Sequence, residues 1–296
     1  MALLTWGMIG AGIAVLVAGL FLVRARFAAA SGAGRVLVLG PVFEAVALAI
    51  FAAEHFLAAR DLSAIVPRWI PGSLFWTYFV GAALLAAAIS FITWRYVRWS
   101  ASLLAVLFLI FVATIHLPNL TKHLHERLFW TIAVRETAFA GGAMVLAGSL
   151  WPRGRSAGTT LILSGRFVVA CTFVFYAIQH FLFPQFVPGV PLGKMTPAWV
   201  PAPALLAYIV GTTLLATGVG LMIRRNDRTA AAIAGTVLLL LTIFFYVPIL
   251  ILEIGTPLAV EGVNYVGDTF LFAATALLAG FGSTGRSSST TDLSSD

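Results

Sequence analysis

The sequence predicts an all-α protein that crosses a membrane many times, and three observations support this prediction. Of its 296 residues, 60% are hydrophobic and only 10% are charged, whereas soluble domains carry about 25% charged residues. Apolar runs of about 20 residues, the length that an α-helix needs to cross a bilayer, recur along the whole chain. Because backbone groups in lipid must be satisfied within the segment, runs of this length indicate membrane-spanning helices.

The apolar runs define nine predicted spans. In chain order they cover residues 2–23, 36–57, 73–94, 100–118, 128–150, 161–183, 204–223, 230–252 and 263–281. Pro41 lies at the start of a span, and Pro118 and Pro248 lie near span ends. Many transporters bind their substrate at helices that are broken near mid-membrane. No Gly-Pro pair interrupts an apolar run there, so the sequence gives less support to a transporter.

Basic residues in the loops predict the orientation, because cytoplasmic loops carry an excess of arginine and lysine. One side holds Arg24, Arg26, Arg35, Arg95, Arg98, Arg153, Arg155, Arg166, Arg224, Arg225, Arg228 and Arg286, and the other holds Arg60, Arg68, Lys122, Arg127 and Lys194. The N-terminus is therefore predicted outside and the C-terminus in the cytoplasm, in the cell inner (cytoplasmic) membrane. The net charge of +7 belongs to these short loops, and no nucleic-acid partner is expected because no extramembrane segment is long enough to form such a surface.

Residues 36–150 and 161–281 align as two four-helix units. The matches run in one order: Glu54-His55-Phe56 with Gln179-His180-Phe181, "VPRWIP" (66–71) with "TPAWVP" (196–201), "YFVG" (78–81) with "YIVG" (208–211), and "ETAFAGGAMVLAG" (136–148) with "DTFLFAATALLAG" (268–280). Gly81 precedes Pro118 by 37 residues, and Gly211 precedes Pro248 by the same 37. The outer loop is five residues longer in the second unit. Since each unit has an even number of spans, both share one orientation and are expected to be parallel repeats.

This organisation divides the chain into four parts. They are an extra N-terminal helix with a basic loop (1–35), the first unit (36–152), the second unit (153–282) and a polar tail rich in serine and threonine (283–296) that is predicted to be disordered. The first span carries Gly7, Gly10, Gly12 and Gly19, which allow close packing against the bundle. No basic segment precedes its apolar run, so a cleaved signal peptide is not expected.

The two units resemble the DoxX family of membrane proteins. The residues that carry the resemblance are a histidine at the outer end of the first helix, the "VPRWIP" loop, the tyrosine and glycine that begin the second helix, and Pro118 near the end of the third. The resemblance covers residues 36–281 and implies two fused DoxX-like units behind an extra helix. It also implies a link to membrane redox systems that use quinones, thiols or thiosulfate, but no catalytic residue set.

Ionisable groups inside predicted spans are functional candidates, because each costs a few kcal/mol to place in lipid. In the first unit they are Glu44, Glu54, His55, His116, Arg135 and Glu136, and their second-unit counterparts are Gln179, His180 and Asp268. The first set lies in the outer half of its unit and is the candidate pocket or proton relay. The second unit has lost most of these groups, which fits either one pocket beside a scaffolding copy or ordinary drift.

Arg135 stays charged and needs a partner in hydrocarbon. We expect an interhelical ion pair with Glu54 or Glu44, because Glu136 follows Arg135 directly and adjacent side chains on a helix do not face each other. The alternative is that Arg135 extends towards the membrane surface without a partner.

The remaining signals have structural as well as functional readings. Trp69 and Trp199 fit either interfacial belt residues or a lid over a pocket. Cys171 is the only cysteine, which excludes an intramolecular disulfide and a cysteine-based haem or zinc site. His123 and His125 would diverge on a helix, so no metal site is predicted.

Two classes of function remain open. One is a subunit or scaffold of a membrane redox system, with a membrane or periplasmic redox partner and a quinone in an outer-leaflet pocket; no other cofactor is evident from the sequence. The other is a non-catalytic assembly factor or a small-molecule transporter. The sequence leaves the enzymatic activity and the oligomeric state open.

Overall fold

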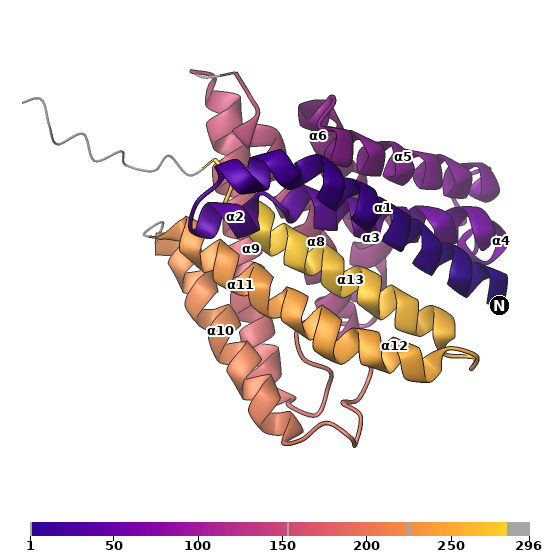
Figure 1. The fold of residues 1–296 in the computed structure, drawn as a ribbon. Coiled ribbons are helices and arrows are strands. Elements are labelled where there is room, and N and C mark those ends of the chain that lie inside the picture. Colours follow the sequence, from indigo (N-terminus) through magenta and orange to yellow (C-terminus); the bar gives the residue numbers. More distant parts are fainter. Residues whose placement is uncertain (1, 153, 224–225, 283–296) are drawn as a thin grey trace, which may run out of the picture.

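The computed structural model describes residues 2–152, 154–223 and 226–282, and they form an all-α bundle (Figure 1). The long helices are α1 (Ala2–Ala29), α3 (Gly40–Leu57), α5 (Ser73–Thr93), α6 (Val97–Phe111), α8 (Arg127–Ser149), α9 (Ser156–Leu182), α10 (Pro203–Ile223), α11 (Asp227–Leu241) and α13 (Ala259–Leu278). Short helices are α2 (Ala33–Leu37), α4 (Ala59–Leu62), α7 (Leu117–Lys122) and α12 (Val247–Glu253), with π-helical turns η1 (Val112–His116) and η2 (Thr242–Tyr246). The predicted disorder of residues 283–296, and Arg153, Arg224, Arg225 and Arg286, lie outside the described residues.

Each predicted span coincides with a helix, which confirms the all-α polytopic fold. Seven helical segments of the described chain are long and apolar enough to cross a membrane. The long helices α8 and α13 are not among these seven, and they are the helices that carry Arg135, Glu136 and Asp268. The charged helices are also largely buried in protein, which shields them from lipid as buried charge requires.

The eight helices α3, α5, α6, α8, α9, α10, α11 and α13 form a closed ring, and two members on opposite sides of the ring also contact each other. Neighbours in the chain pack together from α3 to α8 and from α9 to α13, while α8 packs on α9 and α13 packs on α3. The fourth helix of each half, α8 and α13, also contact each other. Helix α13 thus runs between α11 and α3 (Figure 1). Exchanging the two halves leaves this set of neighbours unchanged, as expected for an approximate two-fold axis.

The same local geometry occurs at matched positions of the two halves. A Cβ added at Gly81 would lie 2.9 Å from His55 Cβ, and one added at Gly211 would lie 2.9 Å from His180 Cβ. Each histidine places Nδ1 against the carbonyl oxygen four residues earlier, at 2.7 Å for His55 and 2.6 Å for His180. Because a larger residue would displace the histidine, glycine at these two positions fixes where the ring lies.

The two π-helical turns are also matched. Each ends two residues before a proline, Pro118 or Pro248. Proline has no amide hydrogen and its ring clashes with the preceding helical turn. A π-turn accommodates this misfit without ending the helix, so the chain continues to Lys122 and Glu253.

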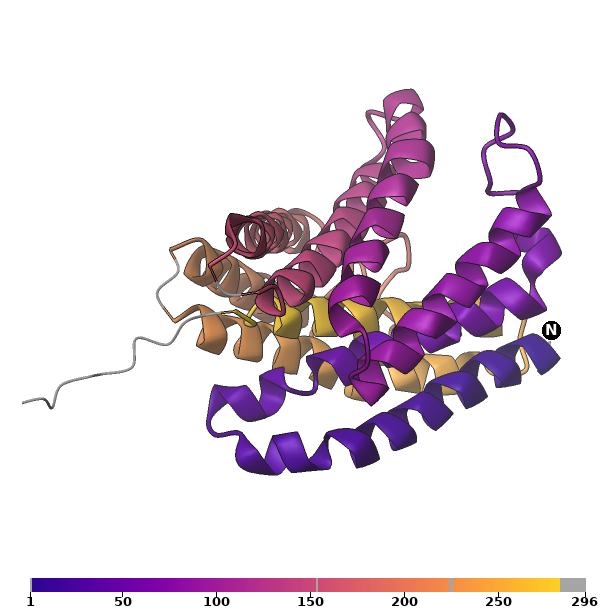
Figure 2. The same ribbon diagram turned by 90° about the horizontal axis from the view of Figure 1, so that it is seen from above.

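Helix α1 lies along one side of the bundle (Figure 2) and packs on α3, α5 and α13. Gly12 faces Ile50, and Gly19 faces Val42, so glycines mediate this contact as predicted. Gly10 is the exception, because a Cβ there would meet no atom within 4 Å.

The seam between α8 and α9 provides a test of the packing. A Cβ at Gly141 would lie 2.8 Å from the carbonyl oxygen of Gly165. We expect Gly141→Ala to lower the free energy of unfolding by about 1–3 kcal/mol, the usual cost of overpacking. The matched control is Gly10→Ala, which should be neutral or gain about 0.5–1 kcal/mol of helix propensity. Detergent-unfolding curves of the two variants check this, and equal shifts would contradict the close approach.

Candidate functional site

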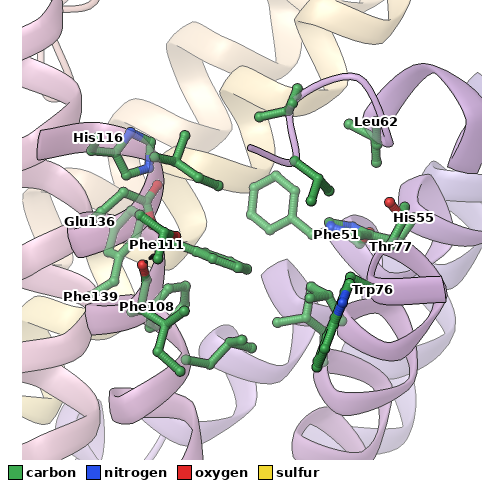
Figure 3. A pocket seen from close by; sticks show the side chains of 18 of the residues that line it. Phe51, His55, Leu62, Trp76, Thr77, Phe108, Phe111, His116, Glu136 and Phe139 are labelled. Carbon is green, nitrogen blue, oxygen red and sulfur yellow. Dashed lines mark hydrogen bonds between the residues drawn. The ribbon is translucent and has the colours of Figure 1, made fainter. Parts of the chain in front are cut away.

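A cavity of about 400 Å³ lies among the helices of the first unit, with Asp268 and Leu271 of α13 completing its lining. Helices α3 and α5 form one wall, and α6, η1 and α8 form the opposite wall, with the loop after α4 at one end (Figure 3). Its volume falls in the range of about 300–1,000 Å³ typical of small-molecule sites. The walls are mainly apolar and aromatic, with Phe51, Trp76, Phe108, Phe111 and Phe139 among them.

Two histidines face each other across this cavity (Figure 3). His55 sits at the C-terminal end of α3, where contact with Gly81 holds it. A backbone carbonyl can only accept, so the His55 Nδ1–H donates to Phe51 O and Nε2 is left with an acceptor lone pair. His116 ends η1 on the opposite wall, and the π-turn required by Pro118 sets its position.

Three charged groups line the deep part of the cavity. Arg135 of α8 donates through Nη1 to Asp268 Oδ2 of α13 and, at 2.9 Å, through Nη2 to Glu136 Oε1. All three side chains are nearly buried, with 11–13% exposure. Asp268 is the counterpart of Glu136 in the aligned units, so Arg135 lies between two matched acids where α8 meets α13. Because one guanidinium faces two carboxylates, one of the carboxylates can accept a proton without giving the cluster a net positive charge.

The predicted pairing of Arg135 with Glu54 or Glu44 is wrong. Glu54 instead accepts a hydrogen bond of 2.9 Å from Asn264 Nδ2 and lines a separate depression. Glu44 is fully buried and neither carboxyl oxygen has a hydrogen-bond partner in the described chain. Both expected partners belong to the first unit, whereas α13 of the second unit packs against α3 and α8 and brings Asp268 to Arg135.

The expectation that Glu136 cannot pair with Arg135, because the two residues are adjacent on one helix, is also wrong. The long arginine side chain bends back, so that its terminal nitrogen reaches the carboxylate of the next residue. Of the six first-unit candidates, the cavity therefore brings together His55, His116, Arg135 and Glu136, and adds Asp268. It does not include Glu44 or Glu54.

The tryptophans of the Pro-Trp-Pro loops do not line the cavity. Trp69 is 71% exposed, and the loop residues that close the cavity are Ile65, Val66, Pro67 and Ile70. Trp199 packs on Phe245, with ring centroids 6.2 Å apart. The tryptophan that does line the cavity is Trp76, which sequence reasoning missed. The spacing of three to four residues between Phe51 and His55, and between Phe108 and Phe111, is the signal that could have identified the aromatic walls.

In the second unit the corresponding space is filled by the protein itself. Pro188–Val190, part of the longer loop, lies against His180 and Tyr246, the counterparts of His55 and His116. Gly189 N–H donates to His180 Nε2 at 2.8 Å, and the Tyr246 hydroxyl donates to Pro188 O at 2.6 Å. Gln179, beside His180, is buried and its Oε1 has no hydrogen-bond partner in the described residues.

Several contacts hold this loop in place. Arg127 donates to Pro191 O at 2.5 Å and to Leu192 O, and its guanidinium lies 3.9 Å from the centroid of the Phe186 ring. Lys194 Nζ pairs with Glu253 at 2.5 Å and with Glu261 at 3.2 Å. Burial alone would lower the pKa of Lys194, but the hydrogen bonds and charges of these two carboxylates outweigh it and raise the pKa above its ordinary value. These contacts fix the position of the loop in the folded protein.

Fold and site together define a polytopic all-α membrane protein with a ligand-sized cavity, whose mainly apolar lining includes two histidines and the Arg135 cluster. A sequence family described as a domain of unknown function (DUF8561) matches residues 45–137, the part that supplies most of the residues lining the cavity. No curated protein matches the chain. No solved structure matches it either.

Proposed function

We propose that this protein is a DoxX-like membrane subunit of a redox system and that its cavity binds a quinone. The observation that carries the proposal is the cavity itself. It combines a volume of about 400 Å³ and aromatic walls with the polar groups of His55, His116 and the Arg135 cluster. Amphipathic ring compounds bind in pockets of this composition, where a few polar groups fix the orientation.

The assignment to two fused DoxX-like units has several supports. The aligned segments share their order and the 37-residue spacing. Matched glycine–histidine contacts, matched π-turns and the exchange symmetry of the helix neighbours agree with a duplication. Under the positive-inside pattern of the arginines, the cavity lies in the outer leaflet of the inner membrane, with the N-terminus outside.

The polar groups suit proton transfer that accompanies quinone chemistry. Oxidation of a quinol to a quinone releases two protons and two electrons. His55 Nε2 takes one proton from a bound hydroxyl, and the Arg135 cluster accepts the second. The electrons pass to a redox protein that associates with this subunit.

Quinone binding in lipid nanodiscs tests this proposal. Thr114 lines the cavity, so Thr114→Trp should fill part of it and reduce the affinity for decylubiquinone at least about tenfold, equivalent to about 1.4 kcal/mol. The matched control is Phe244→Trp at the aligned position of the second unit, where the side chain is 71% exposed. It should bind like the unaltered protein.

Native lipid extraction gives an independent readout. The protein purified in mild detergent should carry quinone, and Thr114→Trp should carry less. If the purified protein holds neither quinone nor quinol, and neither decylubiquinone nor decylubiquinol shows saturable binding in nanodiscs, the proposed function is wrong.

A further inference from the structure

The filled pocket of the second unit shows how its polar groups are satisfied. The Pro188 carbonyl and the Gly189 N–H belong to one peptide group. That single group donates to His180 Nε2 and accepts from the Tyr246 hydroxyl. Val187 and Val190, which flank it, are fully buried. The loop thereby inserts a neutral head with one donor and one acceptor, surrounded by apolar side chains.

The aromatic residues of the first cavity correspond to residues that pack on this segment. A Cβ added at Gly189 would lie 3.2 Å from Leu241 and 3.4 Å from Leu238, which align with Phe111 and Phe108. The first unit has no such insertion, since its outer loop is five residues shorter. In the first unit the corresponding space is the open cavity.

We propose that the first cavity binds an uncharged, lipid-soluble molecule whose head donates a hydrogen bond to His55 Nε2, as the inserted peptide group does to His180. This proposal rests on the proposed function for the site and specifies the ligand class. His55 repeats the geometry of His180: Nδ1–H is committed to a carbonyl four residues earlier, and Nε2 accepts. In the described chain His55 Nε2 has no partner of its own.

The head must be larger than a peptide group. His116 is shorter than the tyrosine at the aligned position, and His55 and His116 lie on opposite walls (Figure 3). A ring with a hydroxyl on one edge spans this space between Phe51 and Phe111. An anionic head is disfavoured, because Glu136 and Asp268 already supply more carboxyl groups than Arg135 can balance. Among quinones, the requirement for a donor selects the reduced, hydroxyl-bearing form.

A pair of probes without redox chemistry tests the donor requirement. In nanodiscs, saturable binding of tritiated para-decylphenol is measured, with an excess of unlabelled para-decylphenol defining non-specific binding. Its methyl ether, para-decylanisole, competes as the probe that lacks the donor. We expect the phenol to bind about tenfold more tightly, the equivalent of one net hydrogen bond.

His55 variants locate the acceptor. In His55→Phe the phenol should lose its advantage, because the phenylalanine side chain cannot accept a hydrogen bond. The affinities of the phenol and its ether should then differ by no more than about twofold. In His55→Gln, whose side-chain oxygen can still accept, part of the preference should return. Equal binding of phenol and ether to the unaltered protein overturns the inference, as does a preference that survives in His55→Phe.

The outcome is separable from that of the proposed function. If decylubiquinone binds but the phenol has no advantage over its ether, the quinone site stands and the donor requirement is wrong. If the phenol is preferred through His55 while neither quinone nor quinol binds, the ligand class stands and the quinone assignment is wrong.

Discussion

Replacing Arg135 with methionine is expected to lower the free energy of unfolding by about 3–5 kcal/mol, the usual cost of breaking a buried ion pair by removing one partner. The reason is that Asp268 and Glu136 would both remain in the interior without the guanidinium that donates to each of them. Asp268→Asn should cost less, because Arg135 keeps Glu136 as a partner. The unfolding free energy in mixed detergent micelles measures both effects.

A double-mutant cycle distinguishes the observed partner from the one that sequence reasoning favoured. Arg135→Met and Asp268→Asn should be coupled by about 0.5–3 kcal/mol, as groups of one network are. Arg135→Met and Glu54→Gln should add to within about 0.5 kcal/mol, because Glu54 bonds to Asn264. Coupling with Glu54 and additivity with Asp268 would overturn the cluster described above.

The fold was accessible from the sequence because each span has to satisfy two simple conditions, length and apolarity. The boundaries of α5, predicted at 73–94 and observed at Ser73–Thr93, illustrate how well turn residues mark the ends. Pro118 and Pro248 were expected near span ends, and the π-turns before them, which carry the helices past both prolines, were not predicted. Even the glycine contacts of α1 followed from the small-residue pattern, with Gly10 as the exception.

The site was only partly accessible, and the reason is tertiary. His55, His116, Arg135 and Glu136 were selected because ionisable groups inside spans are costly. Which of them share a space depends on the order of helices around the ring, and no local pattern states that α13 packs between α3 and α8. Asp268 was therefore assigned to the second unit without a role in the first cavity, and Arg135 was paired with Glu54 or Glu44 instead. The aromatic walls were missed for a different reason, since phenylalanine is equally typical of lipid contact.

The second outer loop exceeds the first by five residues, and the segment 187–191, which holds the inserted peptide group, has the same length. Deleting residues 187–191 would make the two outer loops equal in length. We expect the deletion to lower the free energy of unfolding by several kcal/mol. Each buried group that is left unpaired costs about 1–3 kcal/mol, and each valine removed from the interior costs roughly 1.5–3 kcal/mol. The groups are His180 and Tyr246, and the valines are Val187 and Val190.

The contribution of the inserted peptide group can be isolated with Tyr246→Phe. In the unaltered protein this substitution leaves the Pro188 carbonyl without its donor and should cost about 1–3 kcal/mol. In the deletion background the hydroxyl is itself the orphaned group, so the same substitution should cost nothing or stabilise the protein. Detergent-unfolding curves of the four proteins measure the difference. An equal cost of Tyr246→Phe in both backgrounds would mean that the loop does not occupy the second pocket in solution, and the comparison between the two pockets would lose its basis.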